Sequence, residues 1–222
     1  MNPVVNAALL NTDYCHKHYM LSMVDLFRCT KIPVSISVVS SSNVCISRNL
    51  AVRGAQEQKA EFLFFVDNDI SCPPFTLDRL YRKAVDLNLD IIGCVYPMIS
   101  PPHEILIKTE KEKLEEIDEV NAIANGLCLI RMSVFDKLKE PYFIYEPSPD
   151  VTGHINVSTE DYQFCYKMKK AGMSVWVDTK LSMLVGHWSG KLGLRWAGQS
   201  PSVCEALWQP IGYDLADPSK WI

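Results

Sequence analysis

The chain has 222 residues, of which 48% are hydrophobic and 22% are charged, enough for one large domain with a sizeable core. Its formal net charge of −4 is not the basic balance of a nucleic-acid-binding protein, so we expect no nucleic-acid partner. No apolar run approaches the roughly 20 residues that span a bilayer, and the N-terminus lacks the pattern of a signal peptide. We therefore expect no transmembrane segment.

The eight cysteines do not indicate disulfides. Cys45, Cys94, Cys128 and Cys165 fall inside apolar, periodic segments, and the sequence contains no Cys-x-x-Cys pair. Buried free thiols are typical of a reducing compartment. We therefore expect a cytoplasmic protein.

The first hundred residues alternate between short apolar or β-branched runs and segments of helical periodicity. This alternation predicts an α/β fold of parallel βαβ units with right-handed crossovers. No Gly-x-Gly-x-x-Gly follows the first run and no phosphate-binding loop occurs, which disfavours standard dinucleotide and P-loop nucleotide binding. The predicted strands are residues 4–10, 33–39, 62–66 and 90–96, and the predicted helices are residues 14–28, 44–58 and 76–87.

The pattern changes after Pro97. Asn125-Gly126 separates two apolar runs, and Gly126 permits either a positive φ, a close backbone approach to a ligand, or a plain bulge. Residues 141–153 contain several prolines and are predicted to be irregular. The two apolar runs are residues 117–123 and 127–130. The remaining predicted elements are strands at 104–108 and 174–178 and helices at 133–139 and 158–168, the last ending at Gly172.

The acidic stretch Asp67-Asn68-Asp69 follows the apolar run 62–66, which has the composition of a strand buried on both faces. Ligands bind at the carboxyl ends of strands in open α/β sheets. Two neighbouring carboxylates repel each other there, and a divalent cation shared with a substrate phosphate is the usual compensation. Alternatively, Asp67 caps a turn and Asp69 caps the helix that follows.

Two further charged groups have both a functional and a structural interpretation. Arg48 lies in the first turns of the helix after Asn43, where it suits a diphosphate or a base edge, or else pairs at the surface with an acid such as Glu57. Glu160-Asp161 opens a helix, where acids are favourable without any function. In the functional interpretation, one of these two carboxylates faces a cleft as a general base.

Histidines and a lysine complete the set of candidates. His187 lies between an apolar strand and a Gly-flanked loop, where an imidazole suits a metal site, although a lone histidine is usually structural. Lys191 is placed to reach a phosphate if that loop folds over the site. His16 and His18 stand two apart on a predicted helix, so we expect them on different faces, as surface residues and not as a metal pair.

Taken together and in this order, the motifs resemble those of a GT-A-fold glycosyltransferase of the compact family 2-like type found in bacteria and large DNA viruses. The resemblance covers roughly residues 1–190. It implies a single GT-A (Rossmann-like) domain over 1–222, with a mixed, mainly parallel central sheet flanked by helices. Residues 1–100 would bind the nucleotide sugar, residues 101–190 would supply the acceptor and catalytic half, and residues 191–222 would form a tail. The motifs are Arg48-Asn49, Asp67-Asn68-Asp69, Glu160-Asp161 with Phe164-Cys165, Gly172, Trp176-Val177-Asp178 and Gly186-His187.

The resemblance also implies roles for single residues. Asp69, Asp67 and His187 would hold Mn²⁺ or Mg²⁺ on the donor diphosphate, and Asp161 would be the base. The partners would be a nucleoside-diphosphate sugar donor (UDP or GDP) and a glycan, glycoprotein or glycolipid acceptor. The chemistry would be transfer to a hydroxyl with inversion, retention being the other outcome known among GT-A families. The expected donor-binding residues are Thr12, Arg48, Asp67, Asn68 and Lys191.

Three questions stay open at this point. In many relatives an acid just after the second strand binds the uracil of the donor. This chain has Ser40-Ser41-Ser42 there, so the nucleobase of the donor is not assigned. A nucleotidyltransferase acting on sugar phosphates also places paired acids at strand ends, but usually with a glycine-rich basic loop that residues 11–17 lack. A non-catalytic nucleotide-sugar-binding module is the third possibility.

Overall fold

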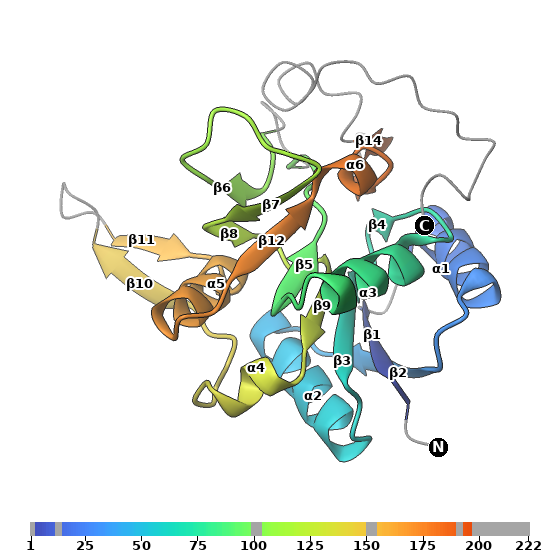
Figure 1. Ribbon diagram of the computed structural model, residues 1–222, viewed down its shortest axis with the longest axis horizontal. Coiled ribbons are helices and arrows are strands. Elements are labelled where there is room, and N and C mark those ends of the chain that lie inside the picture. The colour runs from blue at the N-terminus through green and yellow to red at the C-terminus, as the bar shows by residue number, and fades with distance from the viewer. Residues whose placement is uncertain (1–2, 12–14, 99–103, 150–154, 190–192, 197–222) are drawn as a thin grey trace.

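The computed structural model describes residues 3–11, 15–98, 104–149, 155–189 and 193–196. Within these residues lies a seven-stranded sheet in the order β2-β1-β3-β9-β5-β12-β7 (Figure 1). Strands β2, β1, β3, β5 and β12 run parallel, while β9 and β7 run antiparallel to their neighbours. The predicted mixed, mainly parallel α/β sheet is therefore confirmed, and its arrangement is Rossmann-like. The strands are β1 (Val5–Asn11), β2 (Val34–Ser40), β3 (Phe62–Asp67), β5 (Ile91–Gly93), β7 (Ile117–Val120), β9 (Leu127–Arg131) and β12 (Val175–Asp178).

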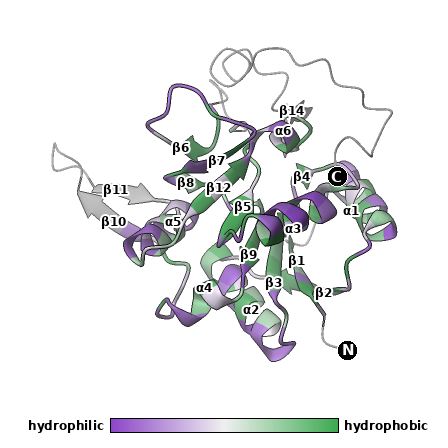
Figure 2. Cartoon of the chain, in the orientation of Figure 1, coloured by the Kyte–Doolittle hydropathy of each residue, from purple (hydrophilic) through white to green (hydrophobic). Residues whose placement is uncertain are grey.

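Helices cover both faces of this sheet and bury a separate core on each. One core packs α1, α3 and α6 against the sheet, and the other packs α2, α4 and α5 against the opposite face. Figure 2 shows the apolar strands in the centre and the polar helix surfaces outside. The helices are α1 (Lys17–Cys29), α2 (Val44–Glu57), α3 (Thr76–Asp86), α4 (Ser133–Asp136), α5 (Glu160–Lys170) and α6 (Thr179–Ser182).

Strand β3 contributes to both cores because its side chains alternate between the two faces. Phe64 and Val66 pack toward α1 and α3, whereas Leu63 and Phe65 pack toward α2 and α5. All four side chains are fully buried. The prediction of a strand buried on both faces is confirmed, and the strand ends at Asp67, where the chain reaches the carboxyl edge of the sheet.

Smaller sheets are built around the main one. A three-stranded antiparallel sheet has the order β14-β13-β4 and places His187 opposite Ile70. Its strands, and those of the two-stranded sheets, are β4 (Ile70–Ser71), β13 (Gly186–Ser189), β14 (Gly193–Trp196), β6 (Ile107–Lys108) with β8 (Ala122–Ile123), and β10 (Glu146–Pro149) with β11 (Ile155–Ser158).

Four sequence predictions about local structure are wrong. The first helix begins at Lys17, because the His16 side chain caps it by accepting from the backbone N–H of His18 at 3.3 Å. The two imidazole rings therefore stack, with centroids 5.1 Å apart, and do not point to different faces. The strand predicted at 90–96 ends at Gly93. Residues 141–153 are not irregular throughout, because part of them pairs in the β10–β11 hairpin.

A buried ion pair joins α3 to β12 and is well satisfied. Arg79 Nε and Nη2 donate to the two carboxylate oxygens of Asp178 at 2.6 Å and 3.1 Å, and Nη2 also donates to Glu116 Oε1 at 2.8 Å. The backbone N–H of Leu181 donates to Asp178 Oδ1 at 2.8 Å, so this carboxylate also caps α6. The pair lies outside the candidate site and is an example of a purely structural ion pair in this fold.

The cysteines named in the sequence are placed as predicted. Cys45, Cys94, Cys128 and Cys165 are buried and free. Burial raises the pKa of the Cys165 thiol to about 12. Among the described residues, none of the helices combines the length and the apolar character needed to cross a bilayer.

Candidate active site

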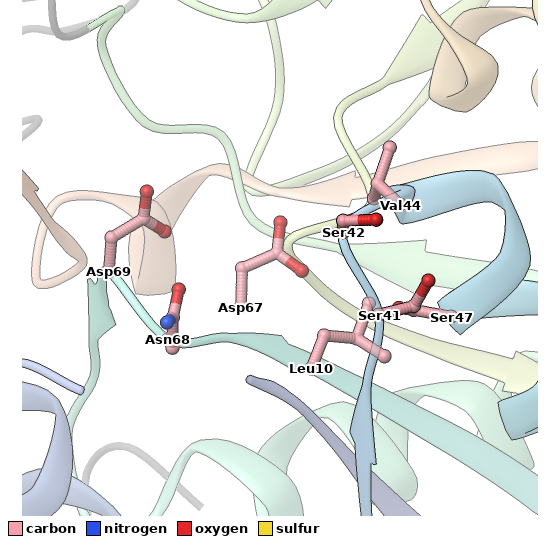
Figure 3. A pocket seen from close by; sticks show the side chains of 8 residues that line it. All are labelled: Leu10, Ser41, Ser42, Val44, Ser47, Asp67, Asn68 and Asp69. Carbon is pink, nitrogen blue, oxygen red and sulfur yellow. The ribbon is translucent and has the colours of Figure 1, made fainter. Parts of the chain in front are cut away.

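The acidic turn lies where β3 leaves the sheet. The backbone N–H of Asp67 donates to the carbonyl of Gly126 at 2.8 Å, which fixes the end of the strand against β9. Figure 3 shows the carboxylates of Asp67 and Asp69 on the same side of the chain, with Asn68 between them. They border a pocket of about 200 Å³. Its lining residues are Leu10, Ser41, Ser42, Val44, Ser47, Asp67, Asn68 and Asp69.

The opposite wall of this pocket comes from the start of α2. Asn43 caps this helix, since its side chain accepts from the backbone N–H of Ile46 at 3.3 Å. Ser41 and Ser42 precede the cap and line the pocket together with Val44. The pocket therefore combines serine hydroxyls and apolar side chains on one side with carboxylates on the other.

His187 lies directly against Asp69, although 118 positions separate them in the sequence. The imidazole Nε2 is 3.3 Å from Asp69 Oδ2. The pairing of β13 with β4 produces this contact, and the backbone N–H of Trp188 donates to the carbonyl of Asp69 at 2.8 Å. The structure thus brings together two of the three predicted metal ligands.

The protonation of His187 is constrained from its other side. Its Nδ1 lies 2.7 Å from the carbonyl oxygen of Pro97 and must donate to it, because a carbonyl only accepts. In the neutral imidazole, Nε2 then presents a lone pair to the Asp69 carboxylate. Burial lowers the pKa of His187, but the hydrogen bond and the charge of Asp69 raise it, and the net shift is upward.

These groups fit a divalent cation whose coordination is completed by a substrate. A histidine whose second nitrogen is held by a backbone carbonyl is a typical ligand arrangement, and Asp67 Oδ1 is buried without a hydrogen-bond partner. Within the described part of the chain, no three His, Cys, Asp or Glu side chains lie close enough to hold a metal by themselves. Mg²⁺ commonly takes only one or two carboxylates together with substrate phosphates.

Arg48 lies beneath the acidic turn, with a side chain that is 1% exposed. It is therefore not the surface arginine of the structural interpretation, and its partner is not Glu57. Its guanidinium contacts three carboxylates, those of Asp67, Glu160 and Asp161, at 3.1 Å, 3.3 Å and 3.1 Å. These acids come from the end of β3 and the first turn of α5, so Arg48 connects the two predicted halves.

Asp161 is in an environment that favours its neutral form. Burial raises the pKa of this carboxyl, Arg48 lowers it, and the charges of Glu160 and Asp67 raise it again, so that the pKa is about 7. Its Oδ1 lies 3.1 Å from Arg48 Nη2 at an angle that makes no hydrogen bond, so the contact is an ion pair alone. A carboxylate that titrates near neutrality is matched to general-base catalysis.

Sequence reasoning missed two residues of the site. The backbone N–H of Gly126 donates to the Tyr96 hydroxyl at 2.9 Å, and the Tyr96 ring packs edge-on against that of His187 at 5.0 Å between centroids. Asn125 is fully buried, and its backbone carbonyl accepts from Arg48 Nη1 at 3.3 Å. An aromatic residue at a strand end and an amide beside a glycine were the available signals, but both patterns are common in loops.

Gly126 is required for space and not for a positive φ, which among the described glycines only Gly172 adopts. A Cβ at Gly126 would meet the Tyr96 hydroxyl and would lie 2.7 Å from Asp67 Oδ2. We therefore expect Gly126→Ala to cost about 1–3 kcal/mol of unfolding free energy, the usual range for overpacking. Urea unfolding measures this cost.

Gly54→Ala is the matched control for this prediction. Gly54 lies inside α2, and the nearest atom to its added Cβ is Ser37 Oγ at 4.0 Å. Because alanine favours the helix, we expect this variant to be unchanged or stabilised by about 0.4–1 kcal/mol. Equal stability of the two variants would contradict the crowding at Gly126.

Two predicted donor-binding residues, Thr12 and Lys191, lie outside the described residues. The other predicted site residues gather at the carboxyl edge of the sheet. Asn68 and both carboxylates of the acidic turn line the pocket, His187 adjoins Asp69, and Asp161 adjoins Arg48.

No family model and no curated protein matches this chain. It is similar in structure to A197 from STIV, for which a crystal structure is known. The similarity covers 83% of this chain and 85% of the A197 chain, with a TM-score of 0.59 and 15% sequence identity. Likeness at this identity shows the α/β fold alone.

Proposed function

We propose that the protein is a metal-dependent glycosyltransferase that moves a sugar from a nucleoside-diphosphate donor to an acceptor hydroxyl. One observation carries this proposal: Asp67, Asp69, His187 and Asp161 come from distant segments and converge at one edge of the sheet, beside a pocket. A carboxylate–imidazole pair suited to a cation and a carboxylate suited to a base are the two parts that this reaction needs.

The donor would bind along the acidic turn. Asp69 and His187 would hold Mn²⁺ or Mg²⁺ with Asp67, whose Oδ1 has no other partner. The cation, when bound, supplies positive charge to the leaving diphosphate. Asn68 lines the pocket and would contact the donor, and Thr12 and Lys191 are proposed as further donor contacts from the sequence alone.

Asp161 would act on the acceptor. Its carboxylate takes the proton of the acceptor hydroxyl while the oxygen attacks the anomeric carbon and the bond from that carbon to the diphosphate breaks. The nucleoside diphosphate leaves, and attack from the opposite face inverts the configuration. The acceptor would be a glycan, glycoprotein or glycolipid. The buried thiols suit a reducing compartment, and we propose a cytoplasmic location.

Two other functions compete with this proposal. A nucleotidyltransferase acting on sugar phosphates would use the same acids for a cation. A nucleotide-sugar-binding module would need the pocket but no base, and the placement of Asp161 beside Asp67 across one guanidinium favours an enzyme over such a module.

Calorimetric titration with UDP and with GDP, each with and without Mn²⁺, tests the proposed function. We expect one of the two to bind at least about tenfold more tightly with Mn²⁺, and the protein to release it from the corresponding nucleotide sugars. Release of pyrophosphate from a nucleoside triphosphate and a sugar phosphate would indicate the nucleotidyltransferase instead. Binding without release from any nucleotide sugar would indicate the binding module.

A further inference from the structure

Arg48 forms ion pairs with both Asp67 and Asp161. A single nitrogen, Nη2, lies 3.1 Å from Asp67 Oδ2 and 3.1 Å from Asp161 Oδ1. The Nε of the same guanidinium donates to Glu160 Oε1 at 3.3 Å, and Nη1 donates to the carbonyl of Asn125 at 3.3 Å. Both carboxylates are therefore positioned by one planar group.

The guanidinium itself has little freedom to move. Its carbon lies 5.2 Å from the centroid of the Phe65 ring and 6.0 Å from that of Phe143, which are fully buried core residues. With 1% of its side chain exposed, Arg48 faces its protein partners and presents almost no surface to a ligand. This placement fits an internal support better than the direct donor contact expected from the resemblance.

The charge balance separates this cluster from an ordinary structural ion pair. Arg79 meets the buried Asp178 through two hydrogen bonds and the half-exposed Glu116 through one, and a backbone N–H completes the Asp178 carboxylate. Around Arg48, three carboxylates share one cation, and the Oδ1 atoms of Asp67 and Asp161 are buried without any hydrogen bond. A pair selected for stability alone has no need of surplus buried acids, because each desolvated charge without a partner is costly.

We propose that Arg48 is a positioning residue that fixes the carboxylate of Asp161 relative to that of Asp67. The group that takes the proton and the group that holds the donor would thereby keep one separation throughout the reaction. This inference rests on the proposed function for its chemistry, but the geometric part, one guanidinium setting two carboxylates, does not. Misplacement by about 1 Å of a catalytic group can cost on the order of 10²-fold in rate.

The test is Arg48→Lys, compared with Arg79→Lys at the structural pair. Hydrolysis of UDP-glucose and GDP-mannose, in which water replaces the acceptor, gives kcat and KM for folded protein without the natural acceptor. We expect Arg48→Lys to lower kcat about 10- to 100-fold with KM changed by less than about threefold, because lysine keeps the charge but cannot reach both acids at once. Arg79→Lys should lower the urea midpoint and leave kcat unchanged.

A double variant shows whether Arg48 acts through the base. In an Asp161→Asn background, Arg48→Lys should produce no further loss of kcat, because residues that act as one unit are not additive. A full additional loss, an increase in KM with kcat unchanged, or an equal loss of kcat in Arg79→Lys would each overturn the proposal.

Crystal structures of the two lysine variants give a readout that is independent of activity. We expect the Asp161 and Asp67 carboxylates to separate in Arg48→Lys and to stay in place in Arg79→Lys. If the wild type releases a nucleoside diphosphate from no nucleotide sugar, the proposed function fails, while these positions still decide whether Arg48 sets the two carboxylates. Unmoved carboxylates in Arg48→Lys would overturn the inference even in an active enzyme.

Discussion

Asp161→Asn is expected to lower sugar transfer by about 10²- to 10⁴-fold, the range usually supplied by a general base. The amide keeps the shape of the carboxylate and its place beside Arg48, but it cannot accept the proton of the acceptor. Binding of the nucleoside diphosphate should change by less than about threefold, because Asp161 does not line the pocket proposed for the donor. Rates of nucleoside-diphosphate release and calorimetric titration with Mn²⁺ measure the two quantities separately.

The control is Glu119→Gln. Glu119 forms a partly exposed ion pair with Lys169 at 2.7 Å, away from the acidic turn. Exposed pairs contribute little to stability, so we expect normal transfer and normal stability. Normal transfer by Asp161→Asn would place the base elsewhere.

The pH dependence follows from the raised pKa of Asp161. The base is active when ionised, so transfer should rise with pH through about pH 7, and positive charge bound nearby would move that midpoint lower. For stability the sign is opposite. The folded protein holds this proton more tightly than the unfolded chain, whose carboxyl titrates near the ordinary value of 3.8, so the stabilising effect of the proton is lost as the pH rises through about 7.

Asp161→Asn removes this cost of ionisation. We expect the variant to be more stable than the wild type by about 1–3 kcal/mol at pH 8 and no different near pH 4, where both side chains are neutral. Urea unfolding at the two pH values provides the comparison. Identical stabilities at pH 8 would show that the surroundings of Asp161 do not disfavour its ionised form.

Asp69→Asn is expected to abolish metal-dependent turnover and to weaken Mn²⁺ binding by roughly 10²-fold or more, since even outer partners of a metal are worth about 10- to 100-fold. The Asp69 side chain is 37% exposed, so little stability should be lost. Electron paramagnetic resonance of free Mn²⁺ reports binding without any need for activity.

Asp25→Asn serves as the matched control for this second substitution. Asp25 lies on the exposed side of α1, and its substitution by Asn removes the same charge from the chain as Asp69→Asn. It should leave both Mn²⁺ affinity and turnover unchanged. If Asp69→Asn retains metal-dependent turnover, the cation is held by other residues.

Much of the fold could be predicted because its strands and helices have clear periodicity. The run that forms β3 is continuous and apolar, and Asp67 follows it directly, so the strand and the acidic edge were both predictable. The direction of β9 was not, because a short apolar run has the same composition whether it lies parallel or antiparallel. Nor was the pairing of β4 with β13, since β4 has only two residues.

The candidate site was predicted in its parts but not in its connections. Asp69 and His187 could be selected one by one, while their contact depends on that short pairing. Arg48 was expected either to contact the donor or to pair with an acid at the surface, and both interpretations leave its side chain accessible. Its burial becomes favourable only when three acids from other segments surround it, and a single sequence does not show that they meet.

Strand β9 has a consequence for how the protein is made. It runs between β3 and β5, so the sheet of the N-terminal hundred residues closes only after residue 131 has left the ribosome. Until then β3 offers an unpaired edge of phenylalanine and valine, a surface prone to aggregation. A fragment that stops before β9 should therefore collect as insoluble material in the cell, although it contains the acidic turn and the start of α2.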